Sequence, residues 1–567
     1  MRFAQYFSRN PIRKDAADQT VEAGAGVFGR VSIAIVAFGM VYAVIAGRLL
    51  YLGMVDGRPS IAYQAAKNSI AAARPDLIDR NGEILATDIK TSSLYAEPRR
   101  ILDVDDAIEA ISSVLPQLDT PRIRRRLESN AGFVWLKREL TPDQQQKIHR
   151  LGVPGIGFVS ESRRFYPGGG VAGHVIGHVN VDNQGIAGLE KYIDGQGLAD
   201  LQKLGLAVNR ELEPVRLAMD IRVQHVVRDE LMRAMERYRA IAAVGIVMNA
   251  HTGEVLGMSS VPDYDPNEPA QALEGNRMNR ATAGVFELGS VFKTFTTAMA
   301  LESGKVGIED SFDARKPLKV STFTINDFHA KRRVLSVPEI FIYSSNIGTA
   351  KMARKVGVAG HKSFMKRFGM LDPITTELPE RASPLKPRKW NELSSMTISF
   401  GHGLSVSPMH AVVTTAALMN GGMLVPPTFF PRDQATAEEV GHRIVKLKTS
   451  KMMRHLFRLN VLRGSGRRAE VGGFRVGGKT GTAEKVVNGR YSSTKRFNSF
   501  LAAFPMDDPQ YVVLVVLDEP KSEKKGVGAT AGLNAAPTVS KIIRRIAPML
   551  RISPKFEGNG TLTVSYR

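Results

Sequence analysis

The 567-residue chain contains no cysteine. It therefore has no thiol nucleophile, no disulfide framework and no cysteine ligand for a metal. Any covalent catalysis must use serine, threonine, lysine or a carboxylate. The absence of cysteine fits an oxidising compartment and the cytosol equally well.

The chain also lacks a zinc-finger spacing, an RNA-binding signature and a cluster of arginines with aromatic residues. Its formal net charge of +22 favours an anionic partner such as a nucleic acid, an anionic lipid or an anionic polymer. Without those signatures, we expect no nucleic-acid partner. The 43% of hydrophobic residues and 23% of charged residues indicate globular domains rather than disorder.

Long apolar runs are scarce, and the longest lies near the N-terminus. Residues 31–47 carry no charge, and the apolar sequence resumes after Arg48 as LLYLGMV. The hydrocarbon core needs about 20 apolar residues in a helix, which this stretch supplies if Arg48 extends its guanidinium to the headgroups. We therefore predict a transmembrane helix over residues 29–53.

The residues before this segment set the expected orientation. Basic residues outnumber acidic ones there: Arg2, Arg9, Arg13, Lys14 and Arg30 against Asp15, Asp18 and Glu22. The positive-inside rule then predicts a cytoplasmic tail over residues 1–28, with the rest of the chain outside. A cleaved signal peptide is an alternative, although the apolar stretch extends past the small residues Ala43 and Ala46. A buried core helix is another, but no polar face interrupts the segment.

The residues that follow predict an α+β module, which we place at 58–225 and describe as a pedestal. Asn81-Gly82 lies between two short apolar runs and is typical of a hairpin turn. Residues 103–151 are charged and helical in pattern, whereas residues 163–190 are glycine-rich and irregular.

A second domain, which we place at 226–552, has a different pattern. It begins with an amphipathic helical sequence near residue 220 and two β-rich runs within 242–261. It closes with further β-rich runs and an apolar-faced helix, at residues 499–505, 511–520 and 534–550. A sheet built from both ends of a domain predicts an α/β fold with a helical insertion. Residues 553–567 form a C-terminal tail.

Three short motifs in this domain carry candidate chemistry, and the first is S-x-x-K. This pattern starts at five serines: Ser290, Ser363, Ser383, Ser492 and Ser522. Only Ser290 opens an apolar helical sequence, in which it shares a face with Lys293. A hydroxyl becomes a nucleophile when a base takes its proton, and burial lowers the pKa of a lysine toward that of a base. The alternative is that both residues lie on a helix surface.

The second motif is Ser344-Ser345-Asn346, just before a helical run. Ser344 and Asn346 flank Ser345, so a hydroxyl and an amide can project from one loop. The alternative is a plain helix cap, for which serine and asparagine are both favoured.

The third motif is Lys479-Thr480-Gly481, followed by Thr482. Neighbouring glycines permit close approach of the backbone, and the lysine and two threonines offer a cation and two hydroxyls to a carboxylate. The alternative is a β-turn with a solvated lysine. The order S-x-x-K, S-x-N, K-T-G within one domain favours a shared site over three unrelated matches.

At these residues the sequence resembles the penicillin-recognising serine acyltransferases. It is similar to the class B penicillin-binding proteins, monofunctional transpeptidases anchored by one N-terminal helix. Further stretches match that family: DRNGEILA (79–86), RRFYP (163–167), GIAGLE (185–190), HTGEVLGMSSVPDYDPN (251–267) and GKTGTAEK (478–485). Within the class, the Ser344-Ser345-Asn346 motif resembles that of the cell-division (septal) type, because the elongation type usually carries aspartate at the position of Asn346.

The resemblance implies the roles of the motif residues. Ser290 is expected to be the nucleophile and Lys293 its base, while Ser344 relays a proton to the leaving group. Asn346 is expected to hold the donor peptide and Lys293. Lys479 is expected to be a further catalytic residue, which lowers the pKa of Lys293 and, with Thr480 and Thr482, holds the terminal carboxylate of the substrate. The expected substrate-binding and oxyanion residues are Thr480, Gly481 and Thr482, and the oxyanion hole is expected from the backbone N–H groups of Ser290 and Thr482.

The resemblance also implies a substrate and partners. The expected reaction cross-links peptidoglycan stem peptides ending in D-Ala-D-Ala, needs no cofactor or metal, and is inhibited by β-lactams. The expected location is the bacterial inner membrane with a periplasmic catalytic domain. A membrane glycosyltransferase and other division proteins are the expected partners. Alternatives are an elongation-type transpeptidase, a D,D-carboxypeptidase or β-lactamase, and a non-catalytic penicillin-binding sensor or scaffold.

Overall fold

The computed structural model describes residues 25–54, 74–198, 212–320, 323–487, 490–523 and 527–556. Most of the predicted cytoplasmic tail and of the C-terminal tail, and the first part of the predicted pedestal, lie outside these residues. The chain divides into two compact units, Met1–Gln64 and Ala65–Arg567.

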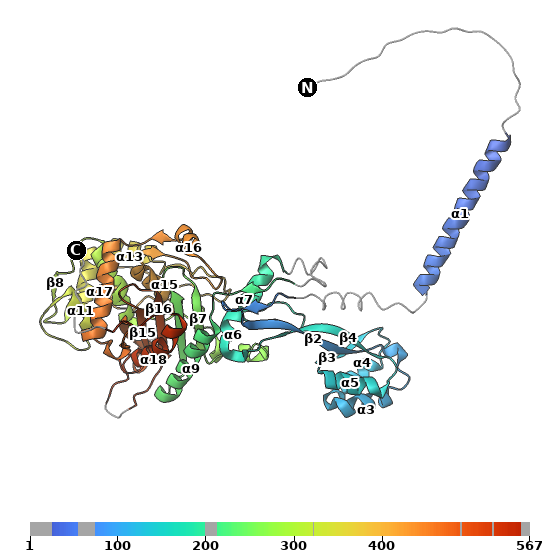
Figure 1. Ribbon diagram of the computed structural model, residues 1–567, viewed down its shortest axis with the longest axis horizontal. Coiled ribbons are helices and arrows are strands. Elements are labelled where there is room, and N and C mark those ends of the chain that lie inside the picture. Colours follow the sequence, from blue (N-terminus) through green and yellow to red (C-terminus); the bar gives the residue numbers. More distant parts are fainter. Residues whose placement is uncertain are drawn as a thin grey trace, which may run out of the picture. The chain divides into compact units, whose positions relative to one another are not determined.

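The first unit contains helix α1, Ala25–Met54, which includes the predicted membrane segment 29–53. Within it, Ser32–Tyr51 is long and apolar enough to cross a membrane, and no part of that stretch is buried against protein. A core helix would bury such residues, so this exposure argues against the core-helix alternative. Figure 1 draws α1 in blue.

The pedestal has a five-stranded sheet of order β3-β2-β1-β5, with β4 also paired to β2. Its strands are β1 (Leu77–Ile78), β2 (Ile84–Ala96), β3 (Val134–Leu140), β4 (Ile156–Phe165) and β5 (Val215–Arg216). The predicted hairpin turn is confirmed, because β1 and β2 pair antiparallel around Gly82, which has φ of +97°. The Asp79 carboxylate accepts the backbone N–H groups of Asn81 and Glu83 at 2.7 and 2.9 Å. It thereby fixes the turn.

Three helices share an apolar core with β2 and β3: α3 (Val104–Val114), α4 (Pro121–Leu127) and α5 (Pro142–Leu151). Two shorter helices, α6 (Gly173–Ile176) and α7 (Gly188–Ile193), contact each other. The helical prediction for 103–151 is therefore confirmed for three segments but missed β3. That strand contains Trp135, Leu136 and three charged residues, so its polarity hid its β character; pairing with β2 decides its structure.

A buried ion network holds the pedestal together. Arg74, Arg164 and Glu190 have fully buried side chains. The Glu190 carboxylate accepts from Arg74 Nε at 2.9 Å and from Arg164 Nε at 2.7 Å. Asp194 and Asp88 lie on the outer sides of the two arginines at 2.6 and 3.1 Å. Glu190 therefore joins the RRFYP and GIAGLE stretches to the start of the described pedestal.

The second domain is built on a five-stranded antiparallel sheet of order β14-β15-β16-β6-β7. Its strands are β6 (Ala242–Asn249), β7 (Val255–Val261), β14 (Gly477–Val487), β15 (Arg490–Phe504) and β16 (Tyr511–Asp518). Strands from both ends of the domain meet in it, as predicted. Leu514 and Val516 of β16 face one apolar core and Val513 and Val515 the other. The sheet is therefore buried on both faces.

Helices α9 (Ile221–Tyr238) and α18 (Ala535–Met549) cover one face of this sheet, and α15 (Pro408–Met419) lies on the other (Figure 1). Helix α9 is continuous through residues 225 and 226, where the sequence places the domain boundary. Because α9 packs on the second domain, we propose that this domain starts before Ile221 rather than at residue 226.

The segment between β7 and β14 is the predicted helical insertion. Its helices, apart from α15, are α10 (Phe292–Glu302), α11 (Val337–Tyr343), α12 (Asn346–Val356), α13 (Val358–Arg367), α14 (Glu392–Ser399), α16 (Gln434–Val440) and α17 (Leu447–Arg463). Short strands also occur there: β8 (Ser311–Asp313), β9 (Leu318–Val320), β10 (Phe323–Ile325), β11 (Val334–Ser336), β12 (Met423–Leu424) and β13 (His442–Arg443). Helix α10 is buried from Phe292 to Leu301, so it is a central helix without a solvent face.

We expect Glu190→Ala to destabilise the pedestal by about 3–5 kcal/mol, because it leaves two buried guanidinium groups without their shared carboxylate. Denaturant unfolding measures this through Trp135 fluorescence in a Trp390→Phe background, since the chain has two tryptophans and Trp135 lies in the pedestal.

Asp143→Ala is the matched control, because Asp143 pairs with Lys147 on the surface at 2.8 Å and exposed pairs contribute little. Equal unfolding midpoints for the two variants would contradict the role given to the buried network.

Candidate active site

The S-x-x-K motif forms the entrance to α10. Ser290 lies in the 3-10 turn Gly289–Val291, and Lys293 lies in the first turn of α10. The Lys293 ammonium donates to Ser290 Oγ at 3.1 Å, and Lys293 is 1% exposed. The two side chains are therefore in contact in a buried setting, and the helix-surface alternative is wrong.

Close packing of backbone fixes this turn against β14. Gly289 has φ of +55°, and a Cβ there would lie 2.8 Å from the Thr482 carbonyl oxygen. On β14, a Cβ on Gly481 would lie 2.6 Å from the Leu288 carbonyl oxygen. Because both positions lack side chains, the turn carrying Ser290 packs directly on the strand that carries Lys479-Thr480-Gly481.

The second motif divides its roles among three residues. Ser345 is the N-cap of α12 and accepts the Gly348 N–H at 3.0 Å, so the predicted capping alternative describes Ser345. Ser344 ends α11 in the left-handed region at φ of 57°. Its hydroxyl accepts from Lys293 Nζ and from Lys479 Nζ, both at 3.0 Å. Asn346 lies at the start of α12, and its amide donates to the Asn326 carbonyl at 2.8 Å.

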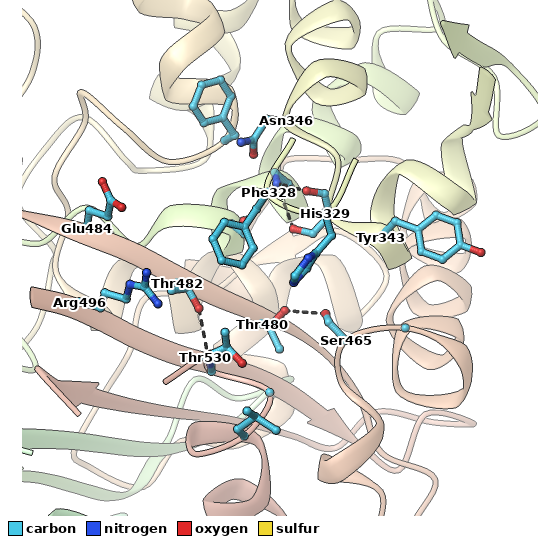
Figure 2. Close-up of a pocket in the computed structure, with 18 of the residues that line it drawn as sticks. Phe328, His329, Tyr343, Asn346, Ser465, Thr480, Thr482, Glu484, Arg496 and Thr530 are labelled. Atoms are coloured by element: carbon cyan, nitrogen blue, oxygen red, sulfur yellow. Dashed lines mark hydrogen bonds between the residues drawn. The ribbon is translucent and has the colours of Figure 1, made fainter. Parts of the chain in front are cut away.

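The third motif lies within β14, at the edge of the sheet. Lys479 has no exposed surface, and its ammonium lies 5.8 Å from the centre of the Phe341 ring. The β-turn with a solvated lysine is therefore wrong. The hydroxyls of Thr480 and Ser465 share a hydrogen bond of 2.6 Å, and Thr482 Oγ1 accepts the Ala531 N–H at 3.2 Å (Figure 2).

Burial lowers the pKa of both lysines. The pKa of Lys293 falls to about 7 through desolvation, while the Asp327 carboxylate acts in the opposite direction. The pKa of Lys479 falls well below its usual range, first through desolvation and then through the charge of Lys293. The ammonium groups of Lys293 and Lys479 both contact the Ser344 hydroxyl and repel each other, which favours the loss of a proton from one of the two lysines. Lys293 can therefore accept the Ser290 proton near neutral pH.

These residues open into one cavity of about 580 Å³. Its lining includes six predicted site residues: Ser290, Lys293, Ser344, Asn346, Thr480 and Thr482. Aromatic and basic side chains also line it, among them Phe328, His329, His402, Arg467, Arg468 and Arg496. Lys479 and Gly481 lie behind the lining, in β14. Of the five S-x-x-K serines, all within the described residues, Ser290 lines this cavity, whereas Ser363 is exposed on α13.

Some site residues escaped the sequence reasoning. Asp327 accepts from Ser345 Oγ and from the Ile347 N–H at 2.8 and 3.0 Å, and no motif marks its place. Ser465 follows α17 in a glycine-flanked segment, which was a weak signal for a loop near the site. His402 lies between two glycines, and burial lowers its pKa to about 4. Ser465 and His402 line the cavity, whereas Asp327 contacts the start of α12. The three residues come from different segments, so spacing did not reveal them.

Comparisons with known proteins agree with this geometry. Residues 243–544 match the penicillin-binding protein transpeptidase domain, and residues 69–197 match the penicillin-binding protein dimerisation domain. The chain belongs to the penicillin-binding protein transpeptidase family. The resemblance inferred from the three motifs is thereby confirmed, and so is the predicted fold class.

Relatives of this penicillin-binding protein cover nearly all of it. It is 40% identical to the probable peptidoglycan D,D-transpeptidase FtsI of Caulobacter vibrioides, over 86% of this chain and 83% of that one. It is 29% identical to the peptidoglycan D,D-transpeptidase FtsI of Escherichia coli, over 86% and 85% of the two chains. A structure of penicillin-binding protein 3 from Mycobacterium tuberculosis in complex with aztreonam has the same fold, with a TM-score of 0.65 and 22% identity over 86% of this chain and 98% of that one.

We expect the rate at which a penicillin acylates the protein to rise with pH around a midpoint near 7. Lys293 must be neutral to accept a proton, and its neutral fraction grows as the pH passes its lowered pKa of about 7. Stopped-flow acylation of the full-length protein in detergent between pH 5.5 and 8.5 measures the midpoint.

Asp327→Asn should move that midpoint to lower pH, because the aspartate charge favours the protonated lysine. Asp310→Asn, which removes an exposed carboxylate paired with Lys355, is the control and should leave the midpoint in place. A midpoint that moves upward in Asp327→Asn would contradict this account.

Proposed function

We propose that this penicillin-binding protein is a peptidoglycan D,D-transpeptidase of the cell-division type. It transfers the acyl group of one stem peptide ending in D-Ala-D-Ala to an amine of a neighbouring stem. The observation that carries the proposal is the meeting of Lys293 and Lys479 on the Ser344 hydroxyl beside Ser290, in an open cavity. Family membership and 40% identity to a probable D,D-transpeptidase support it.

In the first half-reaction, Ser290 Oγ attacks the carbonyl carbon of the penultimate D-Ala. Its proton passes to Lys293 Nζ, the new C–O bond forms, and a tetrahedral oxyanion results. The C–N bond to the terminal D-Ala then breaks, and Ser344 relays a proton to the leaving nitrogen. The 3.0 Å contacts of both lysines with Ser344 Oγ support this relay.

Binding groups hold the substrate during these steps. In this proposal the backbone N–H groups of Ser290 and Thr482 form the oxyanion hole, where one such donor contributes about 2.7–4 kcal/mol. Close packing of Gly289 on Thr482, with Gly481 beside them, supports this assignment. Lys479, Thr480 and Thr482 bind the terminal carboxylate. Asn346, whose amide lies at the cavity, binds the donor peptide.

In the second half-reaction, an acceptor amine attacks the acyl-enzyme. A proton leaves the amine through the same lysine pair, the C–O bond to Ser290 breaks, and the serine recovers its proton. Both halves are acid–base and acyl-transfer chemistry, which the side chains themselves supply. A β-lactam acylates Ser290 in the same way, and its opened ring blocks the site.

We place the protein in the bacterial inner membrane, with α1 crossing it once. The excess of basic residues before α1 supports a cytoplasmic N-terminus, and the catalytic domain then lies in the periplasm. We assign the pedestal and α1 to contacts with a membrane glycosyltransferase and other division proteins. FtsI relatives that match over both domains support this assignment.

We expect a fluorescent penicillin to label the full-length protein covalently and Ser290→Ala to abolish the labelling. The variant lacks the attacking oxygen and retains the cavity. Ser363→Ala, at an exposed serine with the same spacing to Lys366, is the control and should be labelled fully. Denaturing gel fluorescence measures both. Persistent labelling of Ser290→Ala would falsify the assignment.

Analysis of the reaction products distinguishes a cross-linking enzyme from a hydrolase. With purified stem substrates and an acceptor amine, a transpeptidase yields dimeric muropeptides, a carboxypeptidase releases D-Ala alone, and a sensor stays acylated. Depletion in cells separates the division role from elongation, because loss of a division enzyme yields filaments and loss of an elongation enzyme yields round cells.

A further inference from the structure

A short stretch of chain between β16 and α18 forms part of the cavity wall. Thr530, Ala531, Gly532 and Leu533 line the cavity, and we call residues 528–534 the wall segment. The wall segment belongs to no strand or helix. Contacts with neighbouring elements must therefore hold it in place.

Asn498 of β15 fastens the wall segment at both ends. Its side-chain amide donates to the Ala529 carbonyl oxygen at 3.0 Å and to Asn534 Oδ1 at 3.2 Å. These two acceptors flank the residues that line the cavity. Asn498 is fully buried, and its Oδ1 has no hydrogen-bond partner among the described residues. Because a buried unpaired oxygen is destabilising, an apolar side chain would suit this position better if the two N–H groups had no role.

The wall segment reaches the K-T-G strand through one hydrogen bond. The Ala531 N–H donates to Thr482 Oγ1 at 3.2 Å (Figure 2). Thr482 and Asn498 are cross-strand partners in β14 and β15, so their side chains lie on the same face of the sheet. Both side chains contact the wall segment, which therefore connects a buried amide to a residue of the cavity.

This hydrogen bond sets the direction of the Thr482 hydroxyl proton. A threonine hydroxyl has one proton and two lone pairs. Because the Ala531 N–H occupies a lone pair, the proton must point elsewhere. In the part of the chain that the structure describes, no second group bonds Thr482 Oγ1. Since Thr482 lines the cavity, its proton is available to a ligand there.

We propose that Asn498 is a positioning residue for Thr482. Asn498 holds the wall segment, the segment keeps the Ala531 N–H on Thr482 Oγ1, and the Thr482 hydroxyl therefore donates toward the substrate carboxylate. This inference rests on the proposed function, in which Thr482 binds that carboxylate. Asn498 is buried and lies outside the cavity lining, so it acts through the wall segment and touches no substrate.

Replacing Asn498 should weaken recognition of the carboxylate rather than acylation in general. Penicillin carries a carboxylate and its methyl ester does not, so the ratio of their second-order acylation rate constants measures this recognition. With the full-length protein in detergent, we expect Asn498→Leu to lower the ratio about ten-fold, because a misdirected hydroxyl loses a hydrogen bond to a charged group. Asn498→Ser can replace at most one of the two amide hydrogen bonds. It should lower the ratio by less, and it replaces Asn498→Leu in the test if that variant does not fold.

Thr482→Val tests the route from Asn498 to the substrate. It removes the hydroxyl and should also lower the ratio. In a Thr482→Val background, Asn498→Leu should lower the ratio no further, because both substitutions remove the same interaction. A second decrease in the double variant would overturn the route through the Thr482 hydroxyl.

Asn420→Leu is the matched control, since the Asn420 amide also donates to two carbonyls, those of Ala250 and Met423 at 2.8 and 2.7 Å, outside the cavity lining. It should keep the ratio of the unmodified protein. If the Asn498 variants slow acid and ester alike while Thr482→Val lowers the ratio, Asn498 is merely structural and the inference is overturned. Equal rates for acid and ester with the unmodified protein would overturn the carboxylate role of Thr482 in the proposed function, and this inference with it.

Discussion

The active site depends on the burial of two lysine ammonium groups around one serine hydroxyl. Removing an isolated cation from water costs several kcal/mol, and two cations side by side also repel each other. Lys293 and Lys479 bear this cost because Ser344 Oγ, backbone carbonyls and the nearby Asp327 carboxylate offset it. The part of the cost that is not offset lowers the pKa values of Lys293 and Lys479. A lysine that would be a permanent cation in water can thus exist as a neutral amine beside Ser290 near neutral pH.

The fold of the second domain buries the two lysines and brings them together. Helix α10 has no solvent face, so the cores on either side of it desolvate Lys293. Strand β14 lies at the sheet edge and lines the cavity with Thr480 and Thr482, while Lys479 is buried. The turn at Gly289 brings the two together by direct backbone packing. The pedestal adds a separate fold, held by the buried Glu190 network.

Family membership and geometry complement each other here. The family match covers residues 243–544 and gives the class of chemistry. The geometry adds that the Ser344 hydroxyl joins the two lysines, that Ser345 caps α12, and that the Asn346 amide donates to the Asn326 carbonyl. It also places Glu484 and Arg496 in the cavity wall beyond the K-T-G motif.

The sequence by itself determined the membrane segment, the hairpin at Asn81-Gly82, and the strands β6, β7 and β16 with the end of β15, because each rests on local periodicity or on turn chemistry. It also revealed the three motifs, but not that the third lies in a strand, β14. It left open whether those motifs were chemistry or surface. Tertiary packing decided that question, since burial and pKa belong to a site only after distant segments meet. For the same reason β3, Asp327 and the partners of Ser344 became visible only in the folded chain: strand pairing and charge proximity join residues that spacing along the chain does not relate.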